Sequence, residues 1–314
     1  KLHTNAPHHR AAALSVLGCE PTRASVAKIV SIWSAEALEV AIVEAGGCAA
    51  RLRHVDEWAA HSQGMAVAGE PLMHWDMPIG QTANLWQPVS SRPLAGLRVL
   101  DLTRVLAGPV ATRFLAGFGA DVLRVDPPGW DEPAIIPEVT PGKRCTRLDL
   151  TTPAGRGALI TLLREADILV HGYRADALER LGLGAAARRA ICPNLIDISL
   201  NAYGHSGPWV ARRGFDSLVQ FSSGISAAGM NWRGAPAPVS LPVQALDHAT
   251  GYLLAAAAVR GVISRMSGNG PARARLSLAR TAKLLIDHKH RPTDAPMAEF
   301  TDADFDPVIE QTDW

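Results

Sequence analysis

The stretch Arg98-Val-Leu-Asp-Leu-Thr103, followed by Asp121-Val-Leu-Arg-Val-Asp126, decides the fold of this chain of 314 residues. Each is a short apolar run with the length of a buried strand. Residues 109–119 between them have helical periodicity, and Pro109 is tolerated in a first helical turn. A strand, a helix and a second strand in this order predict a βαβ unit with parallel strands.

The same alternation continues toward the C-terminus. We predict strands at 148–150, 167–170 and 194–200, and helices at 153–166 and 175–181. Strands that alternate with helices of about ten residues indicate a mostly parallel sheet. The expected fold class is therefore α/β, with a Rossmann-like large domain.

The chain before residue 92 has a different texture. Apolar residues recur near helical spacing over 25–45, and Gly46-Gly47 ends that pattern. A short helix is expected at 55–60, and residues 73–87 are rich in loop-forming residues. The stretch that follows has linker character, so we place a boundary near residue 92.

The chain is therefore expected to have three segments. These are a small-domain-like segment (1–92), a large domain (93–286) and an acidic C-terminal tail (287–314). The tail is poorly periodic, and it is either solvated or wrapped on a partner subunit.

Composition excludes several classes of protein. Hydrophobic residues make up 47% of the chain, enough for a core, and the net charge of +1 gives no basic field for nucleic acid. No apolar run reaches the roughly 18 residues of a membrane span, and the N-terminus lacks the apolar core of a signal peptide. The four cysteines are far apart, which argues against a disulfide framework or a zinc site. We expect a cytoplasmic protein that binds neither nucleic acid nor membrane.

Common nucleotide and hydrolase motifs are missing. The first strand is followed by Thr103-Arg-Val-Leu-Ala-Gly-Pro109, whereas an NAD or FAD site needs Gly-x-Gly-x-x-Gly there. The sequence contains no P-loop, no Gly-x-Ser-x-Gly elbow and no His-Glu-x-x-His. His288-Lys-His290 is interpreted as a surface tract, so no metal is expected.

Several ordered motifs together resemble the class III CoA-transferases, a family that includes formyl-CoA transferase, carnitine CoA-transferase and the α-methylacyl-CoA racemases. The resemblance implies a Rossmann-like large domain joined to a small α/β domain in an interlocked homodimer. The similar stretches are 93–109, 119–128, 142–150, 167–182 and 204–208.

Residues 1–92 are similar to the small domain near the family's C-terminus, yet here they precede the large domain. Two explanations remain open. Either the chain is a longer, partly duplicated member that lacks its N-terminal segment, or the domain order is rearranged.

The resemblance implies that Asp247 is the catalytic nucleophile. In Val243-Gln-Ala-Leu-Asp247-His-Ala-Thr-Gly, the aspartate follows a short apolar stretch and opens a helix of small residues, as in the family. Its carboxylate would attack an acyl-CoA thioester and later carry CoA itself. The alternative is that Asp247 only caps the helix.

Asp216 is the second catalytic candidate that the resemblance implies, because related transferases place an acid here, near the acyl group. The alternative is an N-cap for residues 217–221. The racemase branch carries a histidine just before this acid. Phe215 stands there in this chain and cannot exchange protons, which disfavours racemisation by that route.

The resemblance also implies a site for coenzyme A, which needs backbone donors, fixed cations and an apolar slot. Leu106 and Pro127 replace a glutamine and an arginine of formyl-CoA transferase, so formyl or oxalyl specificity is not expected. The family's glycine-rich loop over the active site has no match. The implied CoA-binding residues are Val105, Leu106, Ala107, Leu148, Thr151, Gly172, Tyr173, Arg174, Arg180 and Arg213.

The expected function is therefore the transfer of CoA between an acyl-CoA and a small carboxylic acid through an aspartyl intermediate. One alternative is an acyl-CoA racemase or isomerase. Another is a catalytically silent subunit that binds CoA or serves assembly.

Overall fold

The structure, a computed structural model, describes residues 1–76, 86–174, 177–270, 272–288 and 301–309. Within these residues one sheet has the strand order β1-β7-β6-β5-β2-β3-β4. All neighbours in it are parallel except β1, which pairs antiparallel with β7. The strands are β1 (His74–Asp76), β2 (Arg98–Leu102), β3 (Asp121–Asp126), β4 (Lys143–Arg147), β5 (Ile168–His171), β6 (Ile196–Asn201) and β7 (Arg273–Ser277).

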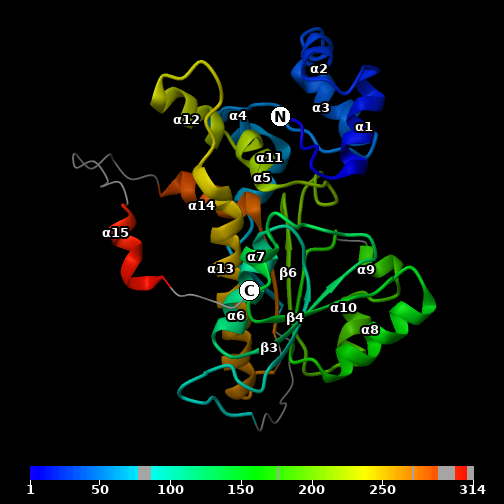
Figure 1. The fold of residues 1–314 in the computed structure, drawn as a ribbon, viewed down its shortest axis with the longest axis vertical. Helices are drawn as coiled ribbons and strands as arrows, with labels where there is room; N and C mark the ends of the chain where they lie inside the picture. Colours follow the sequence, from blue (N-terminus) through cyan, green and yellow to red (C-terminus); the bar gives the residue numbers. More distant parts are fainter. Residues whose placement is uncertain (77–85, 175–176, 271, 289–300, 310–314) are drawn as a thin grey trace.

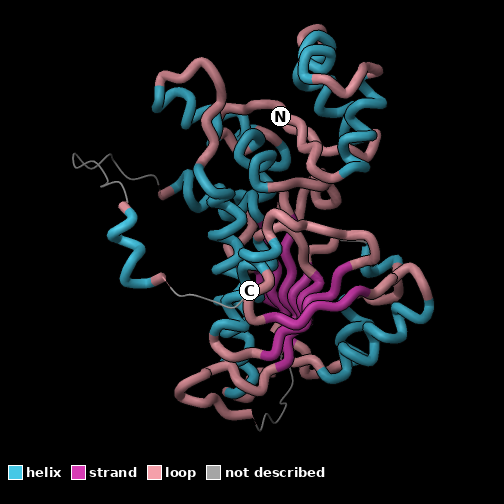
Figure 2. The backbone as a smooth tube through the Cα atoms, viewed as in Figure 1, coloured by secondary structure: helices cyan, strands magenta, loops and turns pink. Residues whose placement is uncertain are grey.

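Helices cover both faces of this sheet, and a further group of helices lies above one end of it (Figures 1 and 2). The helices are α1 (Pro7–Leu17), α2 (Arg23–Val30), α3 (Ala35–Glu44), α4 (Val55–Ala60), α5 (Ser62–Ala68), α6 (Ala107–Gly117), α7 (Ile136–Val139), α8 (Pro153–Glu165), α9 (Ala177–Arg180), α10 (Ala185–Ile191), α11 (Asp216–Ser222), α12 (Ile225–Arg233), α13 (Ala245–Met266), α14 (Leu278–Asp287) and α15 (Asp302–Phe305), with 3-10 turns η1 (Pro242–Gln244) and η2 (Asp306–Val308).

Alternate side chains along the strands pack into two separate hydrophobic cores. In β2, Val99 packs under α6 and α13, whereas Leu100 and Leu102 pack on the side of α8. Helix α13 lies very close to the start of α6, since a Cβ added to Gly251 would be 2.6 Å from the carbonyl oxygen of Ala107. This close packing brings the first turns of α6 and α13 together.

The α/β fold with a mostly parallel sheet is confirmed. The predicted strand at 148–150 is wrong, because the third strand of the unit is β4 at Lys143–Arg147. That strand consists of Lys, Arg, Cys and Thr and pairs only with β3 among the described strands, so its polar sequence hid it.

The helix predicted over 25–45 is also wrong in detail. It is two helices, α2 and α3, because the hydroxyl of Ser34 accepts a hydrogen bond from the N–H of Ala37 (3.1 Å) and starts a new helix. Residues 175–176 of the predicted helix 175–181, and 289–300 and 310–314 of the acidic tail, lie outside the described residues. The boundary near residue 92 remains a prediction; β1, which precedes it, belongs to the large sheet.

Candidate active site

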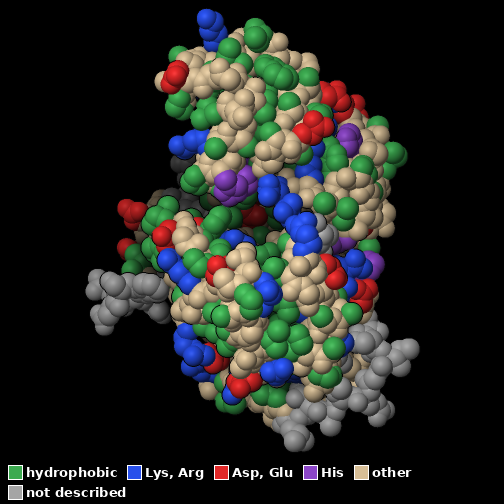
Figure 3. All heavy atoms as spheres, turned by 90° about the vertical axis from the view of Figure 1, so that its right-hand side faces the viewer, with side chains coloured by type: hydrophobic (Ala, Val, Ile, Leu, Met, Phe, Trp, Pro, Cys, Tyr) green, Lys and Arg blue, Asp and Glu red, His purple; other side chains and the backbone are tan. Residues whose placement is uncertain are grey.

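A cavity of about 430 Å³ opens at the carboxyl ends of the parallel strands. It is lined by the loops that follow β2, β5 and β6, including Thr103–Ala107, Gly172–Arg174 and Asn201. β2 and β5 are neighbours although the chain runs from β2 to β3, so the cavity lies at a topological switch point, the usual ligand position in open α/β sheets. Figure 3 shows a hollow on this side, with side chains of His and of the basic class Lys and Arg at its rim.

The loop between β2 and α6 is held in an unusual conformation. Val105 has φ of 68°, a region that β-branched residues rarely adopt and that costs on the order of 1–3 kcal/mol. Its N–H donates to Oε1 of Glu132 (2.9 Å), which fixes the peptide. A Cβ added to Gly108 would be only 2.2 Å from Cβ of Thr103, so the turn also needs that glycine. The strained loop forms one wall of the cavity.

Asp247 lies in the same cavity, in the first turn of α13. The residue is 6% exposed, and within the described part of the chain no group donates a hydrogen bond to its carboxylate. Burial, reinforced by the nearby charge of Asp216, raises the pKa of Asp247 to about 8. A carboxylate without partners in a dry site is poorly solvated and therefore more nucleophilic than one in water.

Asp216 occupies the position behind Asp247 and caps its helix. Its Oδ2 accepts hydrogen bonds from the N–H groups of Leu246 (2.8 Å) and Asp247 (3.1 Å), and Oδ1 accepts from Nε2 of Gln220 (2.6 Å). Burial raises the pKa of Asp216, although these hydrogen bonds oppose the rise. Asp216 therefore orients the first turn that carries Asp247.

This arrangement corrects both capping alternatives. Asp247 is the third residue of α13, whose N-cap is Gln244, and its side chain makes no capping hydrogen bond. Asp216 is the first residue of α11, whose N-cap is Phe215, so it does not cap its own helix. It caps α13 instead, across about thirty residues of sequence.

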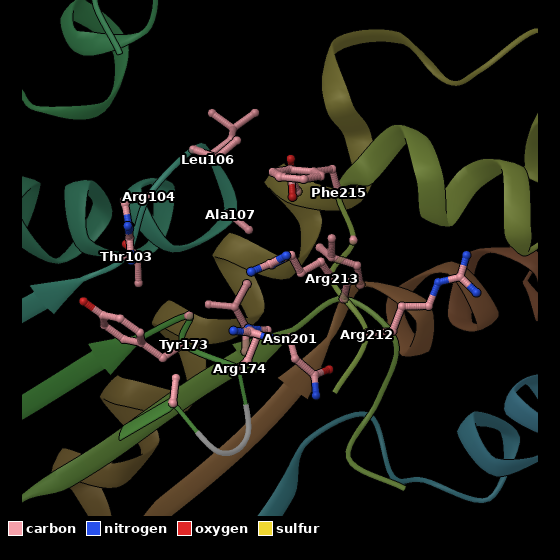
Figure 4. A pocket seen from close by; sticks show the side chains of 18 of the residues that line it. Thr103, Arg104, Leu106, Ala107, Tyr173, Arg174, Asn201, Arg212, Arg213 and Phe215 are labelled. Atoms are coloured by element: carbon pink, nitrogen blue, oxygen red, sulfur yellow. The ribbon is translucent and has the colours of Figure 1, made fainter. Parts of the chain in front are cut away.

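An aromatic and cationic slot lies beside the strained loop. The guanidinium of Arg104 lies 5.1 Å from the ring centroid of Trp130 and 5.2 Å from that of Tyr173. In Figure 4, Arg104 and Tyr173 lie together on one side of the pocket, whereas Arg213 and Phe215 lie across it. Such a slot combines flat apolar surfaces with a fixed positive charge, which suits a nucleotide.

Two further arginines anchor the loop before α11 to the N-terminal segment. Arg212 donates to Oε1 of Glu39 (2.9 Å) and stacks on Trp209, 3.8 Å from the ring centroid. Arg213 donates through Nη1 to the carbonyl oxygen of Gly46 (2.7 Å). These contacts fix the N-terminal helices against the cavity.

Most of the predicted site residues come together. Asp216 lies directly behind Asp247, whereas Leu148, Thr151 and Arg180 are not among the residues that line the cavity. Leu148 packs against the core under α8, and Thr151 bonds the side chain of Asp149. The predicted site residues that line the cavity are Val105, Leu106, Ala107, Gly172, Tyr173, Arg174, Arg213 and Asp247.

Several residues that line the cavity were not predicted from the sequence. His8 and His9 line the cavity from α1, at the other end of the chain from Asp247, and Arg104, Trp130 and Arg212 line it as well. The tandem histidine before a helical stretch was the available signal for the first two. Among the described residues, no group of three or more His, Cys, Asp or Glu side chains could hold a metal ion. No described helix is both long and apolar enough to cross a membrane.

Several curated CoA-transferases are similar to this chain. The chain is 34% identical over 205 residues to the succinate–glutarate CoA-transferase of Agrobacterium fabrum, covering 58% of this chain and 50% of that protein. It is 34% identical over 189 residues to the succinyl-CoA:glutarate CoA-transferase of Mus musculus, covering 56% and 43%. The chain thus spans about half the length of these relatives.

Solved structures of related proteins are also similar to this chain. Rv3272 from Mycobacterium tuberculosis superposes with a TM-score of 0.56 at 31% identity, covering 63% of this chain and 58% of that chain. A CAIB/BAIF family protein from Brucella suis gives a TM-score of 0.56 at 29% identity, covering 63% and 56%. Residues 94–298, more than half of the chain, match the family described as CoA-transferase family III. The chain therefore belongs to CoA-transferase family III.

Proposed function

We propose that the protein transfers CoA between an acyl-CoA and a free carboxylic acid, with Asp247 as the nucleophile. The observation that carries the proposal is a buried carboxylate to which none of the described residues donates a hydrogen bond, in a cavity whose other walls bear arginines and a helix N-terminus. The family and the named relatives support CoA transfer as the reaction type.

The proposed reaction is a series of acyl transfers to and from Asp247. The Asp247 carboxyl group first releases to solvent the proton that its raised pKa retains. The resulting carboxylate attacks the thioester carbon and expels CoA as a thiolate, giving a mixed anhydride. The thiolate attacks the aspartyl carbonyl, releasing the first acid and leaving an aspartyl-CoA thioester. The acceptor carboxylate attacks this thioester, and the expelled thiolate then takes the new acyl group and frees Asp247.

Donors for the developing oxyanion come from the start of α6. Helix α6 begins at Ala107 without a side-chain cap, and no acceptor in the described part of the chain meets the N–H of Ala107. Ala107 lines the cavity, so this N–H and the positive end of the helix dipole are available to a thioester oxygen. The slot of Arg104, Trp130 and Tyr173 would hold the nucleotide part of CoA.

The test is mass spectrometry of the protein incubated with a panel of acyl-CoAs, with hydroxylamine trapping. An adduct on Asp247 that is absent from Asp247→Ala supports the proposal, and the variant should lose at least about 10³-fold in rate. Asp56→Ala, at an exposed position outside the cavity, serves as the control.

The same experiment separates the alternatives. Exchange of the α-proton in D₂O without an adduct would indicate a racemase or isomerase. That function is disfavoured here because Phe215, which cannot exchange protons, stands where the racemase branch carries a histidine. Binding of CoA with neither reaction would indicate a silent subunit. A homodimer is part of the proposal through the family resemblance, and a cytoplasmic location is part of it because the four cysteines are far apart in the sequence.

A further inference from the structure

The first turn of α1 forms part of the cavity wall through His8 and His9. The helix begins after Ala6, which has extended backbone angles (φ −79°, ψ 132°) but no side chain that can cap. Pro7 has no N–H, and no acceptor in the described part of the chain meets the N–H groups of His8 and His9. Its first turn contains no acidic residue. The positive end of this helix dipole is therefore uncompensated.

The imidazole of His9 is a second, independent feature of this wall. His9 is 5% exposed, and neither ring nitrogen has a hydrogen-bond partner among the described residues. A buried polar group without a partner is unusual in a folded protein and calls for a ligand or a water. The ring lies edge-on to Phe215, with 5.8 Å between the ring centroids. In Figure 4, Phe215 lies across the pocket from Arg104.

The charge of the region favours an anion. Burial, followed by the charges of His8, Arg213 and His3, lowers the pKa of His9 to about 4, so its ring is neutral at neutral pH and carries one N–H donor. Arg213, held by the carbonyl of Gly46, adds a fixed positive charge nearby. Asp247 is the one acid among the described residues that line the cavity.

We infer that the first turn of α1, together with His9 and Arg213, binds a carboxylate at the far end of the acyl chain, so that the enzyme selects dicarboxylic acids and their CoA thioesters. The inference rests on the proposed function, in which the reacting carboxyl group lies at Asp247. CoA would enter along the Arg104 side, which leaves the opposite wall, with His9 and Phe215, for the acyl chain.

Two acyl groups of equal length test the inference. Adduct formation on Asp247 is measured with glutaryl-CoA and pentanoyl-CoA, and binding of glutarate and pentanoate to the protein–CoA complex is measured by calorimetry. We expect glutaryl-CoA to be favoured at least about tenfold in kcat/KM, and glutarate to bind more tightly than pentanoate.

The decisive variant is Ala6→Asp. An aspartate at the N-cap would accept hydrogen bonds from the N–H groups of His8 and His9 itself, which stabilises the helix but fills the site with negative charge. We expect a Tm equal to or above that of the wild type, about a tenfold loss with glutaryl-CoA, and no change with pentanoyl-CoA. His9→Leu should act in the same direction, and His9→Asn, which keeps an N–H donor, should lose less. Arg10→Gln, an exposed change on the same helix outside the cavity, is the control.

The outcomes are distinguishable. Equal use of both thioesters, or an equal loss for both in Ala6→Asp, overturns the inference. Weaker binding of CoA itself in Ala6→Asp would also overturn it, because the anion would then be a CoA phosphate. If glutarate binding follows the expectation while no adduct forms on Asp247, the inference stands and the proposed function fails.

Discussion

Two buried carboxylates, Asp101 at the end of β2 and Asp247 at the start of α13, lie in opposite electrostatic situations. Asp101 is fully buried and accepts hydrogen bonds from the N–H and hydroxyl of Thr103, the hydroxyl of Thr112 and Nζ of Lys143 (3.0 Å). Burial alone would raise its pKa, but Lys143 and the hydroxyl groups outweigh it and hold the pKa of Asp101 below its usual value. Asp247 has no such partners, and its pKa is raised.

The difference separates a carboxylate that stabilises the fold from one available to a substrate. Asp101 finds all of its partners within the chain and ties the loop after β2 to α6 and β4. Asp247 faces a cavity, and its carboxylate accepts no hydrogen bond from the part of the chain that the structure describes. The fold therefore gains stability from Asp101 and loses some at Asp247 at neutral pH.

The largest effect is expected for Asp101→Ala, which leaves Lys143 buried without its counter-charge. The free energy of unfolding, measured by urea denaturation, should fall by about 3–5 kcal/mol. Asp121→Ala is the matched control, because Asp121 pairs with Arg144 at an exposed position and should change stability by less than about 1 kcal/mol. Similar losses in the two variants would remove the contrast between buried and exposed pairs.

A comparable effect of opposite sign is expected for Asp247→Asn. The unfolded chain releases the proton of Asp247 near pH 4, whereas the folded protein holds it up to about pH 8, so wild-type stability falls as the pH rises between these values. The variant has no such proton, and its unfolding free energy should exceed that of the wild type by about 5 kcal/mol at pH 8. The advantage should vanish at pH 4. A variant less stable than the wild type at pH 8 would contradict the raised pKa.

The smallest effect concerns Asp216→Asn, which removes a charge behind Asp247 but keeps an oxygen for the N–H groups of Leu246 and Asp247. The like charge contributes to the raised pKa of Asp247, so its removal should lower that pKa. The pH profile of kcat/KM for adduct formation should shift by about one unit toward acid. An unmoved midpoint would mean that burial alone raises the pKa.

The parallel core was predictable because its strands are apolar and separated by turn residues, as in β2 and β3. β4 was missed because Lys143 and its neighbours make a polar strand whose main buried side chain bonds Asp101 rather than packing. The resemblance to the family pointed to Asp247 at the start of a helix, but no sequence pattern indicated the cap that Asp216 supplies to that helix. That contact joins residues about thirty positions apart, and helix periodicity carries no information on it.

The sequence gives only a weak signal for the N-terminal wall, for a related reason. In the sequence, His9 stands at the start of a helical stretch with two other histidines near it, and this context is ordinary. Its significance depends on the contacts of Arg212 and Arg213 with Glu39 and Gly46, which place α1 beside the cavity. Contacts of this kind exist only once the chain is folded.

The edge strand β1 has a consequence for the order of folding. It pairs with β7 and with no other described strand, although the two lie about two hundred residues apart. As the chain leaves the ribosome, β2 to β6 can pair with one another while β1 still lacks its neighbour. We therefore expect β1 and the helices before it to dock onto the sheet among the last elements, and the α1 wall to close over Asp247 only when synthesis has passed β7.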